Sequence, residues 1–181
     1  MSASDVLILS SVESPVGALA FACDAEGVVR GCSFAGGNAA GSGGGLGRAI
    51  AREYPGARIE TGEAQAALVG ALADYFGGDR RALERIAWSL DGSASEAGFQ
   101  ARVWRALADV PAGVTISYGE MAKRAGEPGA AQATGVALNR NPIALVLACH
   151  RVVGADGAMV GFGGGLERKT WLLRHEGALL I

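Results

Sequence analysis

The segment IALVLACHRVV, residues 143–153, is an apolar run interrupted by one reactive cluster, Cys149, His150 and Arg151. The apolar side chains predict that the segment is buried in the core. The thiolate is the reactive form of cysteine, and a neighbouring imidazole can take the thiol proton, directly or through a water molecule. Histidine occurs only twice in the 181 residues, so its place beside a cysteine is informative. The alternative is a buried, inert cysteine whose neighbour faces away.

The residues on either side of this segment have helical patterns. Apolar residues recur at helical spacing at Phe99, Val103, Leu107 and Val110, which predicts a helix. Pro111 ends this helix. Ser117 and Glu120 predict a capping box that opens a short helix, which closes at Gly126. Further helices are expected over residues 130–140 and 166–176. Two short helices around a glycine-containing turn predict a helix-turn-helix, although ordinary core packing produces the same pattern.

The first half of the chain has the pattern of a β-structure. Apolar segments bounded by turn signals predict three strands, at residues 6–13, 17–24 and 28–35. Residues 36–46 are rich in Gly and Ser and predict a flexible loop. A helix is expected over residues 63–76, stopped by Gly77-Gly78, then a short extended piece at residues 86–90 and a linker at residues 91–97.

Composition and charge restrict the class of protein. Half of the residues are hydrophobic, which excludes a disordered chain, and no apolar run reaches the roughly 18 residues of a membrane helix. The first residues do not have the pattern of a signal peptide, and three cysteines cannot form a full disulfide framework, so we expect a cytoplasmic protein. The cysteines and histidines lack the spacing of a metal site. Residues 161–165 are rich in Gly but lack the spacing of a nucleotide-binding loop.

The charge is distributed unevenly along the chain. Residues 1–97 carry seven basic and twelve acidic side chains, whereas residues 98–181 carry nine basic and six acidic ones. A polyanionic partner would therefore meet the C-terminal half, unless the asymmetry arose by chance.

Several motifs occur in a fixed order around the reactive cluster. They are Phe99-Gln100 with Val103-Trp104, Ile116–Glu120, Asn141-Pro142, Cys149–Gly154, Gly164–Lys169 and Trp171–Leu173, with Ser14–Gly17 and Tyr75–Gly78 in the first half. In order and spacing the chain resembles the O6-alkylguanine-DNA alkyltransferases over nearly its whole length. The resemblance implies an α+β fold. A small N-terminal α/β domain with an antiparallel sheet (residues 1–90) is joined by the linker to a C-terminal domain (residues 98–181) that carries the helix-turn-helix and the active-site cysteine.

The resemblance also implies a reaction and roles for the site residues. A flipped O6-alkylguanine, or O4-alkylthymine, gives its alkyl group irreversibly to Cys149, so that each monomer acts once on double-stranded DNA without a cofactor or metal. His150 generates the thiolate and Glu176 orients the imidazole. Tyr118 gives a proton to the leaving guanine, and Asn141 holds the active-site turn.

The DNA-contacting residues follow from the same resemblance. The second helix enters the minor groove, where small residues, Ala131, Gly135 and Ala137, allow close approach of the backbone. Arg140 and Arg151 are expected at the DNA. The base pocket is expected to include Val152, Phe162 and Gly163, and the backbone around Cys149 and Val152 is expected to hydrogen-bond the base.

Some positions depart from the family pattern. Gln132 stands where relatives insert an Arg into the base stack, and Ala148 replaces the usual Pro before the cysteine. Phe162 replaces a common Tyr, and Gly163 a polar residue. These departures concern the rate of repair more than the type of reaction.

Two other functions are compatible with the resemblance. One is a catalytically weak protein that recognises alkylated DNA and signals to another repair pathway; proteins of that class lack the reactive cysteine, so Cys149 favours the enzyme. The other is a module of a transcriptional regulator, which the lack of an upstream cysteine-rich metal domain disfavours.

Overall fold

The N-terminal half is built on a four-stranded sheet in the order β3-β2-β1-β4. The computed structural model describes residues 6–35 and 45–179. The three predicted strands are present as β1 (Val6–Val12), β2 (Leu19–Cys23) and β3 (Val29–Phe34), which pair as an antiparallel meander. The edge strand β4 (Arg58–Thr61) was not predicted; it pairs parallel to β1 and makes the sheet mixed rather than purely antiparallel.

The two faces of the sheet carry different layers. Side chains alternate along β2, so Leu19, Phe21 and Cys23 face the main core while Ala20 and Ala22 face the other side. That second side is covered by α1 (Gly45–Glu53), whose Leu46 and Ile50 lie one turn apart and are buried. The helix was not predicted, because the expected glycine-rich loop extended to residue 46. The rest of that loop lies outside the described residues.

The main-core face is covered by α2 (Ala66–Phe76), followed by the short 3₁₀ helix η2 (Ala82–Arg85). The predicted helix over residues 63–76 is confirmed but begins three residues later, because Gln65 has an extended backbone. The predicted extended piece at residues 86–90 makes one bridge to the sheet, from Trp88 to Val29.

The C-terminal half is mainly helical, as expected. Its elements are α3 (Gly98–Leu107), β5 (Ile116–Ser117), α4 (Tyr118–Arg124), α5 (Ala131–Asn139), η3 (Cys149–Arg151), β6 (Val152–Val153) and α6 (Leu166–His175). The Ser117 hydroxyl accepts the Glu120 N–H at 3.1 Å, as the capping box predicts. The Glu120 carboxylate instead pairs with Arg124, so the reciprocal bond of the box is replaced by an ion pair within α4.

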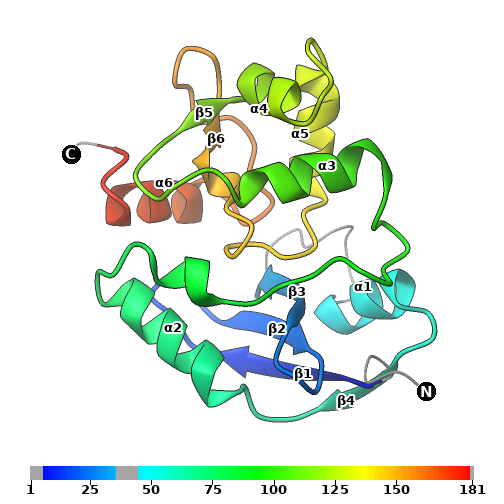
Figure 1. Cartoon of the computed structure of the whole chain (residues 1–181). Helices are drawn as coiled ribbons and strands as arrows, with labels where there is room; N and C mark the ends of the chain where they lie inside the picture. The colour runs from blue at the N-terminus through cyan, green and yellow to red at the C-terminus, as the bar shows by residue number, and fades with distance from the viewer. Residues whose placement is uncertain (1–5, 36–44, 180–181) are drawn as a thin grey trace.

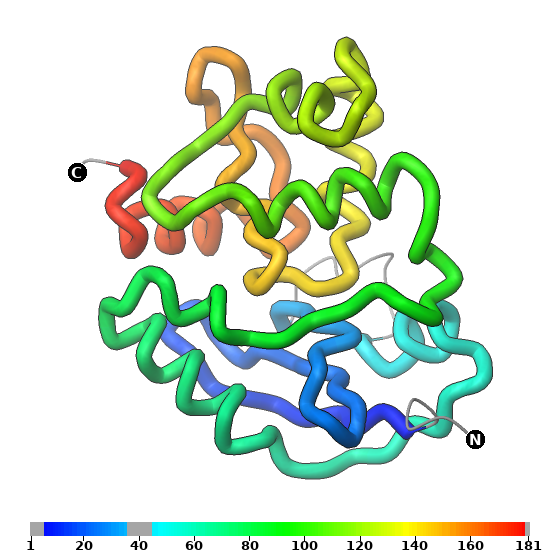
Figure 2. Tube along the Cα trace, viewed as in Figure 1, coloured from blue at the N-terminus to red at the C-terminus, as the bar shows by residue number. Residues whose placement is uncertain are grey.

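The two halves lie one above the other and share one apolar core (Figure 1; Figure 2). The free edge of β3 bonds to the segment that leads to the reactive cysteine. The Cys32 N–H donates to the Pro142 carbonyl at 2.9 Å, and the Ala144 N–H donates to the Cys32 carbonyl at 3.0 Å. The active-site segment is thereby anchored to the sheet. Within the described ranges, no helix combines the length and apolar character needed to cross a membrane.

Candidate active site

Cys149 begins the short helix η3 and is buried. The turn before it is held by Asn141, whose amide donates to the Leu147 carbonyl at 2.7 Å and whose side-chain oxygen accepts the Ile143 N–H at 3.0 Å. Inside this turn Leu145 has a φ of 70°, which is unusual for a bulky residue. The bond from Asn141 to Leu147 spans the turn, and with the bond from Ile143 it stabilises this strained backbone.

The surroundings of Cys149 keep its sulfur protonated at rest. Burial raises the pKa of the thiol, while the Asn141 side chain and the positive charge of Lys169 act in the opposite direction without cancelling it. A buried thiol of this kind needs a base before it can act as a nucleophile.

His150 has the protonation state that such a base needs. Burial lowers the pKa of His150, although Glu176 acts against this shift, so the imidazole is neutral near pH 7. Its Nε2 atom lies 3.0 Å from Glu176 Oε1. An ionised carboxylate only accepts hydrogen bonds, so we assign the proton to Nε2 and the lone pair to Nδ1. Nδ1 is buried and has no hydrogen-bond partner among the described residues, which leaves it able to accept a proton.

Glu176 caps the C-terminus of α6 and is fully buried. Burial alone would raise the pKa of this carboxyl, but the hydrogen bonds from His150 and Arg151, with the positive charge of Arg151, hold it well below its usual range. Arg151 donates through Nε to Oε2 at 2.9 Å and through Nη2 to Oε1 at 2.8 Å. The predicted link between His150 and Glu176 is therefore present, with Arg151 as a partner that the sequence did not reveal.

Arg151 was expected at the DNA, and this expectation is wrong. Its side chain is buried, and its remaining nitrogen, Nη1, donates to the Val110 carbonyl. A buried cation requires hydrogen-bond acceptors, and the Glu176 carboxylate and the Val110 carbonyl accept the hydrogen bonds of this guanidinium. The apolar run around residues 143–153 was the available sign that Arg151 would face the core.

Tyr118 lies beside the reactive cysteine. The parallel pairing of β5 with β6 sets Ser117 against Val153, and Tyr118 follows directly at the start of α4. Burial raises the pKa of the Tyr118 phenol, and the nearby Cys149 raises it further when its thiol is ionised. The hydroxyl donates to the Val160 carbonyl at 3.0 Å. The phenol therefore stays protonated near neutral pH and can act as a proton donor.

Helix α5 presents part of its surface to solvent next to Tyr118. Gln132 and Arg140 are exposed, and Ala131 is half-buried. A Cβ atom at Gly135 would lie 3.7 Å from the Tyr118 ring, so this glycine lies between the helix surface and the site. Ala137 does not fit its expected place: it is fully buried, and its carbonyl accepts the Trp104 indole N–H at 2.7 Å, so it packs in the core.

Lys169 is a site residue that sequence reasoning missed. It is fully buried, and its ammonium group donates to the carbonyls of Val152 at 2.7 Å and Val160 at 3.1 Å. A signal was present in the sequence, since Lys169, Leu172 and Glu176 follow the i, i+3, i+7 spacing of one helix face. Charged residues on an apolar face indicate buried, paired groups.

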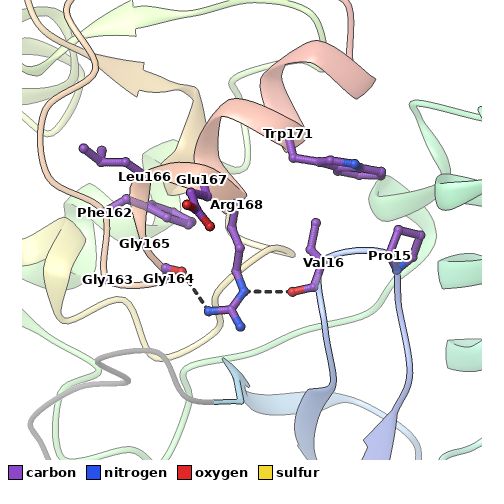
Figure 3. A pocket seen from close by; sticks show the side chains of 10 residues that line it. All are labelled: Pro15, Val16, Phe162, Gly163, Gly164, Gly165, Leu166, Glu167, Arg168 and Trp171. Atoms are coloured by element: carbon purple, nitrogen blue, oxygen red, sulfur yellow. Dashed lines mark hydrogen bonds between the residues drawn. The ribbon is translucent and has the colours of Figure 1, made fainter.

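Val152, Phe162 and Gly163 were expected around the base. Val152 is fully buried, and its backbone carbonyl accepts a hydrogen bond from the Lys169 ammonium group. Phe162 and Gly163 line a cavity of about 640 Å³ at the start of α6, whose lining does not include Cys149 (Figure 3). Arg168 closes one side of this cavity by bonding the carbonyls of Val16 and Gly164. The place of Phe162 and Gly163 in a base pocket stays a prediction.

Known proteins resemble this chain in sequence and in fold. The family model described as 6-O-methylguanine DNA methyltransferase, DNA binding domain, matches residues 98–178. A methylated-DNA--protein-cysteine methyltransferase of Salmonella typhimurium is 46% identical over 110 residues, which are 61% of this chain and 62% of that protein. The matched part thus spans less than two thirds of that relative. A protein of the same name from Mycolicibacterium paratuberculosis is 50% identical over 117 residues, 65% of this chain and 68% of that protein.

The solved structures extend the likeness to both halves. The structure of Mycobacterium tuberculosis OGT in complex with DNA superposes with a TM-score of 0.72 at 33% identity, covering 94% of this chain and 93% of that one. The O6-methylguanine-DNA methyltransferase of Pyrococcus kodakaraensis has a TM-score of 0.64 at 24% identity, covering 94% of this chain and 99% of that one, and shares the fold. These matches, with Cys149, His150 and Glu176 brought together in one site, place the chain in the 6-O-methylguanine-DNA methyltransferase family.

Proposed function

We propose that this protein repairs alkylated DNA by direct reversal, moving the alkyl group of O6-alkylguanine onto its own Cys149. The observation that carries the proposal is a buried thiol that precedes a neutral imidazole in the chain. The Nε2 atom of this imidazole is held by Glu176, and its Nδ1 atom has no hydrogen-bond partner in the part of the chain that the structure describes. In this arrangement the imidazole can take the thiol proton inside a buried site, which generates the nucleophilic thiolate.

The proposed transfer is a displacement at carbon. The Cys149 thiol gives its proton to His150 Nδ1, directly or through a water molecule, and Sγ attacks the alkyl carbon. A new carbon–sulfur bond forms while the bond between that carbon and guanine O6 breaks, and its electron pair stays on the guanine. Tyr118 supplies the proton that neutralises the guanine and regains one from the imidazolium. The net change moves one alkyl group from oxygen to sulfur and one proton from thiol to guanine.

The product explains a single turnover. A thioether is a stable bond with a poor leaving group, so the alkyl group would stay on Cys149. Each protein molecule therefore removes one alkyl group, and O4-alkylthymine is a further candidate substrate of the same chemistry.

The DNA side of the proposal rests on α5. Ala131, Gln132 and Arg140 lie on its accessible surface, and Gly135 brings that surface close to Tyr118. A helix with small residues suits the minor groove, and Gln132 would fill the space that the flipped base leaves. Val152, Phe162 and Gly163 would complete the pocket for that base.

The domain organisation is part of the proposal. We place the boundary at residues 91–97, because the family model begins at residue 98. We also propose that the protein acts as a monomer in the reducing cytoplasm, which suits its three free cysteines.

Intact-mass spectrometry after mixing with duplex DNA that contains O6-methylguanine tests the proposal. We expect the mass of one CH₂ unit to be added per protein, and only to the tryptic peptide that contains Cys149. The Cys149→Ser variant provides the control. Methylation of Cys23 or Cys32, or turnover beyond one equivalent, would contradict the mechanism. Tight binding without any transfer would identify a damage-recognition protein instead.

A further inference from the structure

We propose that Tyr75, from the N-terminal half, is a positioning residue for the transfer reaction, acting on His150 through Glu176. This inference rests on the function proposed above. Tyr75 lies in the last turn of α2 and is fully buried. Its hydroxyl donates to Glu176 Oε1 at 2.8 Å, across 101 residues of sequence.

The contacted oxygen is the one that holds the imidazole. Glu176 Oε1 accepts from Tyr75 at 2.8 Å, from Arg151 Nη2 at 2.8 Å and from His150 Nε2 at 3.0 Å. His150 and Arg151 are adjacent in η3, so both move with the active-site turn. Of these three donors, only Tyr75 comes from the sheet half. It therefore fixes the carboxylate relative to the rest of the molecule.

Several side-chain contacts fix the end of α2, and with it the position of Tyr75. The His175 imidazole lies with Nε2 2.7 Å from the Tyr75 carbonyl oxygen and is stacked on Trp171, with ring centroids 4.9 Å apart. Phe76 packs edge-on against Tyr75 at 5.1 Å. These contacts join the C-terminal ends of α2 and α6, so the Tyr75 hydroxyl and the Glu176 carboxylate are positioned together.

The direction of the hydrogen bond determines its effect. Burial, with the charge of Glu176, raises the pKa of the Tyr75 phenol far above neutrality, so it donates at every working pH. A donor on Oε1 neutralises part of the negative charge that would otherwise stabilise an imidazolium at His150. Tyr75 therefore helps to keep His150 neutral and ready to accept the thiol proton.

Replacing Tyr75 by Phe would leave the other charged and titratable groups around His150 unchanged. Glu176 and Lys169 face it from α6, and Arg151 and Cys149 flank it in η3. Removing only the Tyr75 hydroxyl leaves all four in place. The pKa of His150 should then rise, because its carboxylate partner has lost a competing donor.

The test compares Tyr75→Phe with Tyr54→Phe in the full-length protein. Tyr75→Phe keeps the ring in its aromatic contacts. Tyr54 is also buried in the N-terminal half, but it belongs to the apolar cluster on the other face of the sheet. Its hydroxyl lies 3.5 Å from the Ser89 carbonyl oxygen and also interacts with Arg30 and Ser93. The rate of methyl transfer to Cys149 is measured from pH 5.5 to 9. We expect Tyr75→Phe to move the acid limb of the rate profile to higher pH by roughly half to one pH unit. The transfer rate on that limb should then fall about threefold to tenfold. Tyr54→Phe should leave it in place.

A second measurement separates this inference from the proposed function. The chain has only two histidines, so the ring proton of His150 can be titrated by NMR without any DNA. Tyr75→Phe should raise its pKa, and Tyr54→Phe should not. A wild-type protein that transfers no alkyl group would overturn the proposed function, while the titration would still test Tyr75. Unchanged titration of His150 in Tyr75→Phe, or a rate loss equal at every pH, would assign Tyr75 a merely structural role.

Discussion

The Arg151 guanidinium holds both oxygens of the Glu176 carboxylate, with Nε 2.9 Å from Oε2 and Nη2 2.8 Å from Oε1. This bidentate pair is buried and fixes the carboxylate that contacts His150. One arginine thus supports the site from the inside, where the family resemblance had suggested a contact with DNA. A buried ion pair of this kind is sensitive to the loss of either partner.

Removal of Arg151 should destabilise the fold. Arg151→Gln leaves Glu176 as a poorly compensated buried charge, and we expect a loss of about 3–5 kcal/mol in the free energy of unfolding. Urea unfolding followed by circular dichroism measures it. Arg124→Gln is the matched control, since Arg124 forms a solvent-exposed pair with Glu120 and should cost less than about 1 kcal/mol. Equal losses in the two variants would contradict the buried role of Arg151.

Removal of the imidazole should slow transfer in a pH-dependent way. At pH 7 we expect His150→Ala to reduce the rate by about 10²–10⁴-fold, the usual contribution of a general base. Because burial raises the pKa of Cys149, the deficit should persist above pH 8.5, the usual thiol range, and shrink only as the pH rises further. Single-turnover rates with a free O6-alkylguanine base from pH 6 to 10 measure this. A rate at pH 7 equal to that of the wild type would show that His150 is not the base.

A charged residue at the exposed Gln132 should improve repair of duplex DNA. Gln132→Arg adds a phosphate contact, so the rate on duplex should rise, and the log–log salt dependence of DNA binding should steepen by roughly 0.9. The reaction with a free base should stay unchanged, because this side chain does not reach the thiol. Ala73→Arg, on the exposed surface of α2, adds the same charge away from α5 and is the control. An equal effect of Gln132→Arg on both substrates would mean that Gln132 does not occupy the base stack.

A proline before the reactive cysteine should be accepted by the backbone. Ala148 has a φ of −74°, within the range that proline imposes. Ala148→Pro should stabilise the protein by about 0.4–1 kcal/mol, through reduced freedom of the unfolded chain. Thermal unfolding checks this against Ala144→Pro, which removes the N–H that bonds Cys32 and should be destabilising. A destabilised Ala148→Pro would show that this turn requires more freedom than its φ suggests.

Local patterns in the sequence determined most of the secondary structure. The apolar strands between turn signals, the helices around Val103 and Leu172 and the cap at Ser117 depend on neighbours within a few residues, so they can be predicted directly. The adjacency of Cys149 and His150 and the place of Asn141 before the turn are equally local. Two elements were missed for different reasons. Strand β4 has four residues and is mostly exposed, so it has little apolar periodicity. Helix α1 does have apolar residues one turn apart, Leu46 and Ile50, but the expected glycine-rich loop extended over its first residues.

Which way a side chain faces, and what meets it, was decided only by the tertiary structure. Arg151 and Ala137 were expected at the DNA, yet both are buried, because the core packed around η3 and α5 leaves them no path to solvent. Tyr75 and Glu176 are 101 residues apart, and no spacing rule connects a residue at the end of one helix with the cap of another. The sequence by itself determined the reactive group and its neighbours along the chain. Folding decided the electrostatics of that group, because burial and long-range hydrogen bonds set the protonation of Cys149, His150 and Glu176.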